Sequence, residues 1–437
     1  MGTLSGAERR AKALKGVVRI FAVSDIHVDY PVNLEWVDAL AARTDLANDV
    51  LILCGDVSDR LPLLRHTLHQ LSSAFGLVVF VPGNHELWVR GEIARGDPVD
   101  SPGRLAWIGD TCEELGIAIK PVRVGACMIV PLLSWHHKSF DTEPDVDGPT
   151  ARLFACADYK ACRWPDWVPG ADRNGSEELA AWVDALNDVG RDVPGSSDVV
   201  GGSEGAQDVA RALGRGLTAL GAAEVARQHS LHVITTAHFL SDIRLLPEKR
   251  FLYLPALAKA CGSLPLAARL RAVRNAAGGG CGVASTHVFG HSHFAWDTGA
   301  EDAWERGAGL GDGARYMQLP LAYPDERARR LPSLMPAPGV HAARGGFEAD
   351  RDSIERACED VDHVRSPWLP ACVYTTLCGD SDAGGAEAGE ARSVVGPAPR
   401  MACSWSSYYE HRARTPEDVT VAPWVARRRA RRREDLS

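Results

Sequence analysis

The sequence contains no C-x-x-C pair among its eleven cysteines. Several of these cysteines, such as Cys54 and Cys127, lie inside apolar runs, where a thiol behaves as a small hydrophobic side chain. A chain of 437 residues with 45% hydrophobic residues is also long enough to bury one large core or two smaller ones. The pattern therefore excludes a small disulfide-stapled scaffold and indicates a reducing compartment.

Long apolar runs and targeting signals are also missing. No run approaches the roughly 18 to 20 residues that a membrane span needs, and the apolar stretch at 17–23 is too short for a signal-peptide core. The N-terminal MGTLSG does not complete a myristoylation signal, because Gly6 stands where Ser or Thr is required. We expect a soluble cytoplasmic protein without a membrane span.

Positive charge is scarce relative to negative charge, since the formal net charge is -9. Acidic excess of this kind makes nucleic acid an improbable main partner. The exception is the run RRRARRR at 427–433, for which two interpretations stay open. It is either a solubilising, disordered end, or a nuclear-targeting or anion-contacting tail.

Strand-like and helical segments alternate in the first third of the chain. Short β-branched strands are predicted at 17–24, 49–55 and 76–83, with helices between them at 33–44 and 60–75. A helix at 104–115 and a strand at 126–135 follow. Such alternation is typical of a layered α/β fold with largely parallel strands.

The pattern weakens at 136–230, which we interpret as a cap-like insertion. It contains helical candidates at 177–189 and 206–227, joined by a Gly/Ser/Asp-rich segment that is typical of a flexible linker. Beyond it the sheet is expected to resume, with strands at 231–238 and 285–293, a helix near 265–276 and a hairpin-like run at 314–324. We therefore predict an N-terminal tail (1–16), a domain at 17–325 and a C-terminal extension (326–437) with a disordered loop around 380–399.

Polar clusters follow the ends of five of these strands. They are D-x-H (Asp25, His27), G-D-x-x-D (Asp56, Asp59), G-N-H-E (Asn84, His85, Glu86), His238, and G-H-x-H (His291, His293). Ligands of open α/β sheets bind at the carboxyl ends of strands, so one edge could gather all five clusters. Each cluster alone is more often a turn, a helix cap or a core histidine. Their joint occurrence on successive strand ends favours function.

The side chains in these clusters are carboxylates, imidazoles and one amide, without a thiolate. They suit hard or borderline divalent ions such as Mn, Fe, Zn or Mg, and seven ligands exceed what one ion needs. Two ions close together require a shared ligand, and a carboxylate can bridge whereas a neutral imidazole cannot. Asp56 is our candidate bridge.

The motif series D-x-H, G-D-x-x-D, G-N-H-E, His and G-H-x-H resembles the calcineurin-like metallophosphoesterase superfamily over about 17–323, apart from the insertion. The resemblance implies a four-layer α/β/β/α sandwich with a dinuclear centre. It implies that Asp25, His27 and His293 hold one metal ion. It further implies that the other ion is held by Asn84, His238 and His291, with Asp56 bridging.

The resemblance also implies that His85 is not a ligand but contacts the substrate and protonates the leaving group. The nucleophile would be a hydroxide held by the two cations, whose pKa such ions lower toward about 7. Asp59 is expected to orient His85. Arg60 is a candidate phosphate contact by analogy with protein serine/threonine phosphatases, although Leu61 replaces the Gly that usually follows.

The sequence differs from two subfamilies of this superfamily, purple acid phosphatases and protein phosphatases, at specific positions. Asp59 occupies the place of the metal-binding Tyr of purple acid phosphatases. Protein phosphatases have Gly where this chain has Val28 and lack the terminal G-H-x-H. We interpret Glu86 as support for its loop, because the ligand set is complete without it. We interpret His136 and His137 as structural or surface residues rather than pocket-lining ones.

Two alternative functions are consistent with these motifs. The first is hydrolysis of a phosphomonoester or phosphodiester, with a small-molecule substrate and two divalent metal ions. The alternative is a non-catalytic, metal-binding interaction scaffold on the same fold. Substrate specificity would reside in the insertion and the extension, which carry no motif that we can interpret, and the oligomeric state is unknown.

Overall fold

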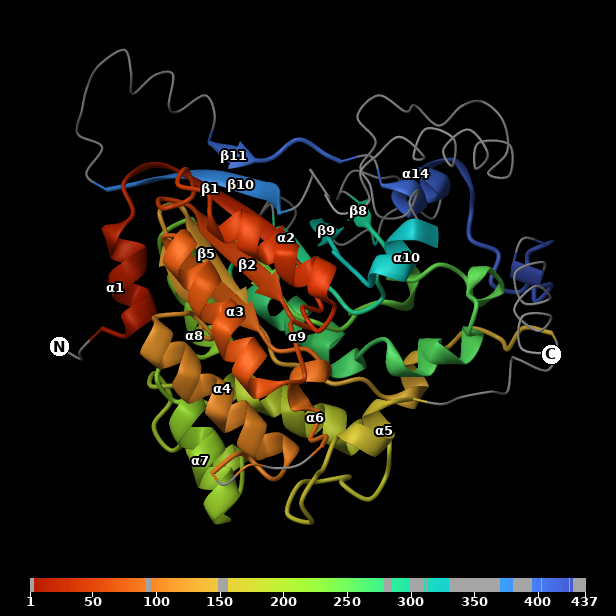
Figure 1. Cartoon of the computed structure of the whole chain (residues 1–437), viewed down its shortest axis with the longest axis horizontal. Helices are drawn as coiled ribbons and strands as arrows, with labels where there is room; N and C mark the ends of the chain where they lie inside the picture. The colour runs from red at the N-terminus through yellow and green to blue at the C-terminus, as the bar shows by residue number, and fades with distance from the viewer. Residues whose placement is uncertain are drawn as a thin grey trace.

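Two β-sheets pack face to face in the computed structural model of the chain (Figure 1). The structure describes residues 4–91, 94, 96–147, 156–278, 285–298, 310, 313–329, 370–379, 395–401, 403–423 and 425–426. The basic run at 427–433 and most of the predicted loop at 380–399 lie outside these residues. No helix in the described part of the chain is long and apolar enough to cross a bilayer.

The first sheet contains the parallel strands that the N-terminal pattern predicts. Its order is β11-β10-β1-β2-β3, and the three parallel strands are β1 (Gly16–Val23), β2 (Val50–Cys54) and β3 (Leu77–Val81). The edge of this sheet is formed by two strands of the C-terminal extension, β10 (Ala371–Cys378) and β11 (Gly396–Pro397). β10 runs antiparallel to β1, so the extension completes the sheet.

The second sheet has the order β4-β5-β6-β7-β9-β8. Its centre is parallel and its two edge pairs are antiparallel. The strands are β4 (Val122–Val124), β5 (Cys127–Pro131), β6 (His232–Thr236), β7 (Ser285–Phe289), β8 (Trp296–Thr298) and β9 (Ala314–Gln318). The hairpin-like run predicted at 314–324 is wrong in detail, because 314–318 is a strand paired with β8 and residues 319–323 form a loop.

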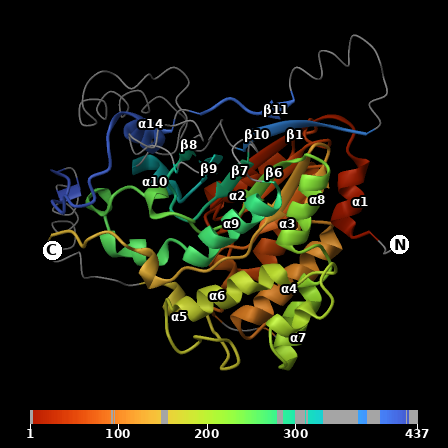
Figure 2. The same cartoon turned by 180° about the vertical axis from the view of Figure 1, so that it is seen from behind.

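Alternating side chains of the second sheet show how the layers pack. Ile129 and Ile234 belong to the core shared with the first sheet, whereas Val130 and Val233 pack beneath helices α8 (Ala219–Gln228) and α9 (Leu264–Ala276). These two helices cover the sheet on the side seen in Figure 2. The other outer layer is made by α2 (Pro31–Ala41), α3 (Leu61–Ala74) and α4 (Ser101–Leu115), in front of the first sheet in Figure 1. The predicted four-layer α/β/β/α sandwich is confirmed.

Local signals set the ends of these helices. In α4 the Asp100 side chain accepts a hydrogen bond from the backbone N–H of Gly103 at 2.7 Å, and Gly116 at φ 67° ends the helix in the left-handed region. The helix predicted at 206–227 is instead two helices, α7 (Glu204–Leu213) and α8. Gly214 and Gly216 lie at the break, where glycine disfavours helix continuation.

Residues 132–231 connect β5 to its parallel neighbour β6. This connection carries α5 (Asp158–Ala161), α6 (Glu177–Ala185), α7 and α8. α7 packs against α4, and α8 belongs to the outer layer of the second sheet. The limits of 136–230 as an insertion stay a prediction, although its last helix is part of the sandwich.

Candidate functional site

The carboxyl ends of strands from both sheets meet at one place. Asp25 and His27 follow β1, Asp56 follows β2 and Asn84 follows β3. From the second sheet, His238 follows β6, and His291 and His293 follow β7. The structure therefore brings together all seven side chains that we predicted as ligands; their role as ligands stays a prediction.

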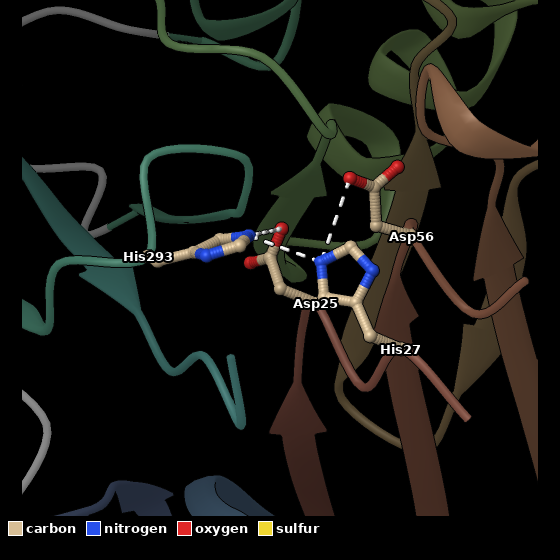
Figure 3. A group of neighbouring side chains, drawn as sticks. All are labelled: Asp25, His27, Asp56 and His293. Carbon is tan, nitrogen blue, oxygen red and sulfur yellow. Dashed lines mark hydrogen bonds and ion pairs between the residues drawn. The ribbon is translucent and has the colours of Figure 1, made fainter. Parts of the chain in front are cut away.

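A first group consists of Asp25, His27, Asp56 and His293, which Figure 3 shows pointing toward one another. One nitrogen or oxygen atom from each lies within 4.8 Å of the others, and all four side chains are buried. The Nε2 atoms of His27 and His293 are 3.0 Å apart, and Asp25 Oδ1 lies 3.6 Å from His293 Nε2. Two carboxylates and two imidazoles could hold one divalent cation.

A second group is formed by Asp56, His238 and His291, with Asn84 beside them. The Asn84 Oδ1 atom lies 3.1 Å from His238 Nε2 and 3.1 Å from His291 Nδ1. Asp56 belongs to both groups, because Oδ1 lies 3.3 Å from His238 Nε2 whereas Oδ2 lies 3.8 Å from His27 Nε2. Each oxygen of this carboxylate therefore faces a different group.

The backbone adopts uncommon conformations to bring these side chains together. Five of the seven residues have positive φ angles: Asp25 (53°), His27 (39°), Asp56 (56°), His291 (78°) and His293 (59°). Such conformations cost non-glycine residues of the order of 1–3 kcal/mol each and persist where the surroundings over-determine them. Gly83 is also required, since an added Cβ atom would lie 2.2 Å from Asp56 Oδ1. The local sequence is thus adapted to the site rather than to backbone stability.

Hydrogen bonds on the far side of the rings orient three of the histidines. His238 Nδ1 donates to the carbonyl of Cys54 at 2.9 Å, and His291 Nε2 donates to the carbonyl of Ala260 at 2.9 Å. His293 Nδ1 is paired with the carboxylate of Glu326. Each of these rings therefore presents its other nitrogen to the groups, as metal-bound histidines in proteins do.

Burial and neighbouring charges shift the pKa values of these residues. Burial, reinforced by His293, lowers the pKa of His27 well below its usual range, and burial with His238 lowers the pKa of His291 to about 3. Burial also lowers the pKa of His238, but the Asp56 carboxylate outweighs this effect and raises it to about 10. For Asp56 itself burial opposes ionisation, yet the nearby His238 and His85 rings hold its pKa well below the usual range. An ionised Asp56 thus favours positive charge among the surrounding nitrogen atoms.

The chemistry of the two groups fits divalent cations. Asp25 Oδ2 is buried and has no hydrogen-bond partner among the described residues, although a buried carboxylate oxygen normally has one. A cation coordinated by this oxygen would satisfy it. The donor set of carboxylate, imidazole and amide atoms, without a cysteine, matches the ligands expected for such ions.

Glu86 supports the loops rather than facing the groups. Its carboxylate accepts four backbone N–H groups, from Asp56 (2.9 Å), Val57 (2.7 Å), Ser58 (3.1 Å) and Gly83 (2.6 Å). Burial, followed by the nearby Asp56 carboxylate, raises its pKa to about 7. The interpretation of Glu86 as loop support is confirmed.

We expect the substitution Glu86→Gln to destabilise the fold by about 2–4 kcal/mol. The introduced amide N–H₂ would face two backbone N–H donors, and each buried donor left unsatisfied costs about 1–3 kcal/mol. Urea unfolding followed by circular dichroism would measure the change. An unchanged midpoint and slope would contradict the role of this carboxylate.

His85 lies at the edge of the site with 13% of its side chain exposed. Its Nε2 atom lies 3.7 Å from Asp56 Oδ2 and 3.4 Å from the hydroxyl of Tyr323. The ring packs against Trp88, with 3.5 Å between the ring centroids. This side chain is next to both groups yet accessible, as a residue that contacts a substrate must be.

The Asp59 carboxylate is close to an arginine in this structure. The Asp59 carboxylate lies 3.5 Å from Arg90 Nη1, and in the described part of the chain no ion pair joins it to His85. The expected orientation of His85 by Asp59 therefore stays a prediction. Arg90 also packs over the Trp88 ring at 3.8 Å. Arg60 is exposed at the N-cap of α3, and its phosphate contact stays a prediction.

Three residues of the site were missed by the sequence analysis. Glu326 lies one residue beyond the predicted domain limit, Tyr323 lies in the loop after β9, and Asp158 lies in the predicted insertion. Tyr323 reaches the site because the backbone N–H groups of Leu321 and Ala322 donate to Ser24 and Asp25 carbonyls at the end of β1. None of the three belongs to a motif, and only the contacts across the fold reveal them.

We expect Glu326→Gln to weaken binding of a cation by the first group about 10- to 100-fold, the usual effect of losing a carboxylate partner of a metal-bound histidine. Isothermal titration with Mn²⁺ would measure it. The exposed residue Glu35 on α2 provides a control, as Glu35→Gln should bind like the unaltered protein. Equal affinity in all three proteins would contradict the orienting role of Glu326.

Residues 18–138 match the family model described as calcineurin-like phosphoesterase. This stretch is therefore similar to calcineurin-like phosphoesterases. This stretch includes β1, β2 and β3 with Asp25, His27, Asp56, Asn84 and His85, whereas the histidines of the second sheet lie beyond it.

A curated protein to which this chain is similar is the [acyl-carrier-protein] phosphodiesterase PptH of Mycobacterium tuberculosis (strain ATCC 25618 / H37Rv). It is 32% identical over 130 residues, which are 28% of this chain and 38% of that protein. The match thus spans just over a third of the relative's length. The crystal structure of phosphopantetheinyl hydrolase (PptH) from Mycobacterium tuberculosis aligns at a TM-score of 0.47 and 18% identity, covering 76% of this chain and 100% of the other.

Proposed function

We propose that the chain is a metal-dependent phosphoric ester hydrolase with two divalent cations. The observation that carries this proposal is the position of Asp56, whose two oxygens face two separate ligand groups. Asp25, His27 and His293 would hold one cation, and Asn84, His238 and His291 the other. The chemistry of the donor set leaves Mn, Fe, Zn and Mg as candidates.

Cations bound in this way supply Lewis acidity, which lowers the pKa of water and neutralises phosphoryl oxygens. The residues of the chain orient the ligands and supply the proton. Asp56 belongs to both groups and so joins them. The carbonyls of Cys54 and Ala260 accept hydrogen bonds from His238 and His291 and so orient these two rings toward the site. His85 is the proton donor to the leaving oxygen, since it borders both groups and is accessible.

A phosphodiester is the substrate class that we favour over a phosphomonoester. The support is the name of the relative PptH, an acyl-carrier-protein phosphodiesterase that is 32% identical to this chain over 130 residues. We accordingly propose a substrate with a phosphopantetheine-like diester, either a small molecule or an arm attached to a carrier protein. A cytoplasmic location is in keeping with the cysteines of the described residues, among which no disulfide is formed.

The metal-binding scaffold is the alternative function. Both ligand groups and His85 are intact and oriented toward one another, which supports catalysis over a scaffold that has lost it.

A hydrolysis screen tests the proposal. Purified protein of known metal content would be assayed with p-nitrophenyl phosphate, its bis-ester and acyl carrier protein bearing phosphopantetheine, in the presence of Mn²⁺. We expect hydrolysis of the diesters to exceed that of the monoester and to stop on chelation. Metal-replete protein that hydrolyses none of the three would favour the scaffold.

A further inference from the structure

A buried carboxylate, Asp158, lies behind the second ligand group at the first position of α5. It is 3% exposed and belongs to the connection between β5 and β6, where the sequence shows no motif. Its position is therefore set by the fold and not by a neighbouring strand end.

Four donors converge on this single carboxylate. Oδ1 accepts from Asn84 Nδ2 at 2.8 Å and from Trp88 Nε1 at 2.6 Å. Oδ2 lies 2.9 Å from His136 Nε2 and 3.3 Å from Cys156 Sγ. Both oxygens are thus fully used, and the ionised form of Asp158 satisfies every one of these contacts.

The contact with Asn84 decides which atom of its amide faces the second group. Because Nδ2 donates to Asp158, Oδ1 must point toward His238 and His291, where it lies 3.1 Å from each. A flipped amide would place Oδ1 against the Asp158 carboxylate and turn the N–H₂ group toward the cation. A neutral amide can ligate a cation only through its oxygen, so this orientation is essential.

Trp88 links the same carboxylate to the proposed acid. Its indole N–H is held by Asp158 Oδ1, and its ring packs against the ring of His85. Asp158 Oδ1 therefore orients the Asn84 amide and also fixes the Trp88 ring against which His85 packs.

His136, Cys156 and Asp158 are close enough together to be considered as a third cation site. The contacts argue against this, since Asp158 has no free lone pair on either oxygen once its four donors are counted. Burial also raises the pKa of the Cys156 thiol, which opposes the thiolate that a cation would need. The three side chains are better explained as a hydrogen-bonded support.

We propose that Asp158 is a positioning residue that fixes the Asn84 amide for the second cation. This inference rests on the proposed dinuclear function, but it concerns metal binding and not hydrolysis. According to this inference, the connection between β5 and β6 helps to form the second cation site.

The test is the number and affinity of bound Mn²⁺ ions, measured by calorimetric titration and elemental analysis in Asp158→Ala, Asp158→Asn and the exposed control Asp166→Asn. We expect Asp158→Ala to weaken the second ion about 10- to 100-fold and to leave the first unchanged, as loss of an outer-shell partner does. Asp158→Asn should recover most of the affinity, because its amide oxygen can still accept from Asn84 Nδ2. The control should match the unaltered protein.

An exchange of the two side chains keeps the inference falsifiable if Asp158→Ala does not fold. Asn84→Asp alone would place two carboxylates at a contact that is now a 2.8 Å hydrogen bond, and should lose the second ion. The double variant Asn84→Asp with Asp158→Asn restores a donor–acceptor pair and should regain it.

Two results would overturn the inference. The first is that Asp158→Ala and Asn84→Asp both bind the second ion as tightly as the unaltered protein does. The second is a loss in Asp158→Asn as large as that in Asp158→Ala. If the unaltered protein binds two ions, either of these results contradicts the role of Asp158 but not the proposed function. If the unaltered protein binds fewer than two ions, the role of Asp158 and the proposed two-cation function are both contradicted.

Discussion

Replacing Asp56 with alanine is expected to abolish binding of both cations and to reduce phosphoester hydrolysis more than about 10³-fold. Each Asp56 oxygen faces a different group, so this one change removes a ligand from both. Even a single preorganised electrostatic donor contributes about 10²- to 10³-fold to a rate, and the change removes the basis for two cations. The backbone N–H of His85, which donates to Asp56 Oδ1 at 3.1 Å, would lose its acceptor as well.

Elemental analysis and turnover would be measured together in this variant. Asp38→Ala is a matched control, because it removes an exposed carboxylate from α2, away from the ligand groups. Asp56→Asn is a useful intermediate, since the amide keeps the shape but not the charge of a bridging carboxylate. Two tightly held cations in Asp56→Ala would contradict the bridge.

Replacing His85 with alanine is expected to leave both cations bound but to reduce turnover about 10²- to 10⁴-fold, the usual contribution of a positioned acid. The ring is outside both ligand groups, and its Nε2 atom is close enough to the site to reach a leaving oxygen. The two variants therefore separate the functions: Asp56→Ala loses metal and rate, and His85→Ala loses rate alone.

The leaving group gives a second measure of His85. A good leaving group such as p-nitrophenolate needs little protonation, so His85→Ala should slow its release less than the release of an alcohol. Loss of the same size for both substrates would contradict a role as proton donor. Loss of cations from His85→Ala would instead make His85 a ligand.

Much of the site could be predicted because its side chains are local to strand ends. Each of Asp25, Asp56 and Asn84 follows a short apolar strand, and parallel strands align their carboxyl ends. The sequence thus indicates which residues converge without any knowledge of how the sheets pack. The alternation of strands and helices predicts a layered α/β fold, whereas the four-layer arrangement was implied by the family resemblance.

The supporting residues could not be predicted, because their roles depend on contacts between distant segments. Asp158 is 74 positions from Asn84, and Glu326 is 33 positions from His293. Neither lies in a periodic or motif-like stretch. Strand β10 was missed for the same reason, since its pairing with β1 joins residues more than three hundred positions apart and no local pattern specifies it.

Asp59 has a neighbour that the sequence analysis did not predict. An analogy assigned it to His85, whereas in this chain Arg90 is available and lies 3.5 Å from its carboxylate. The packing of Arg90 on Trp88 adds a cation–π contact that the sequence does not specify. The resemblance identified residues that converge at strand ends, but it did not reveal the contact of Asp59 with Arg90, whose position depends on a loop.

Anomalous diffraction from crystals grown with Mn²⁺ would test the dinuclear centre most directly. We predict two peaks about 3.5–4 Å apart, with Asp56 between them, one beside His27 and His293 and the other beside Asn84, His238 and His291. A single peak, or two peaks without Asp56 between them, would contradict the dinuclear centre that we propose.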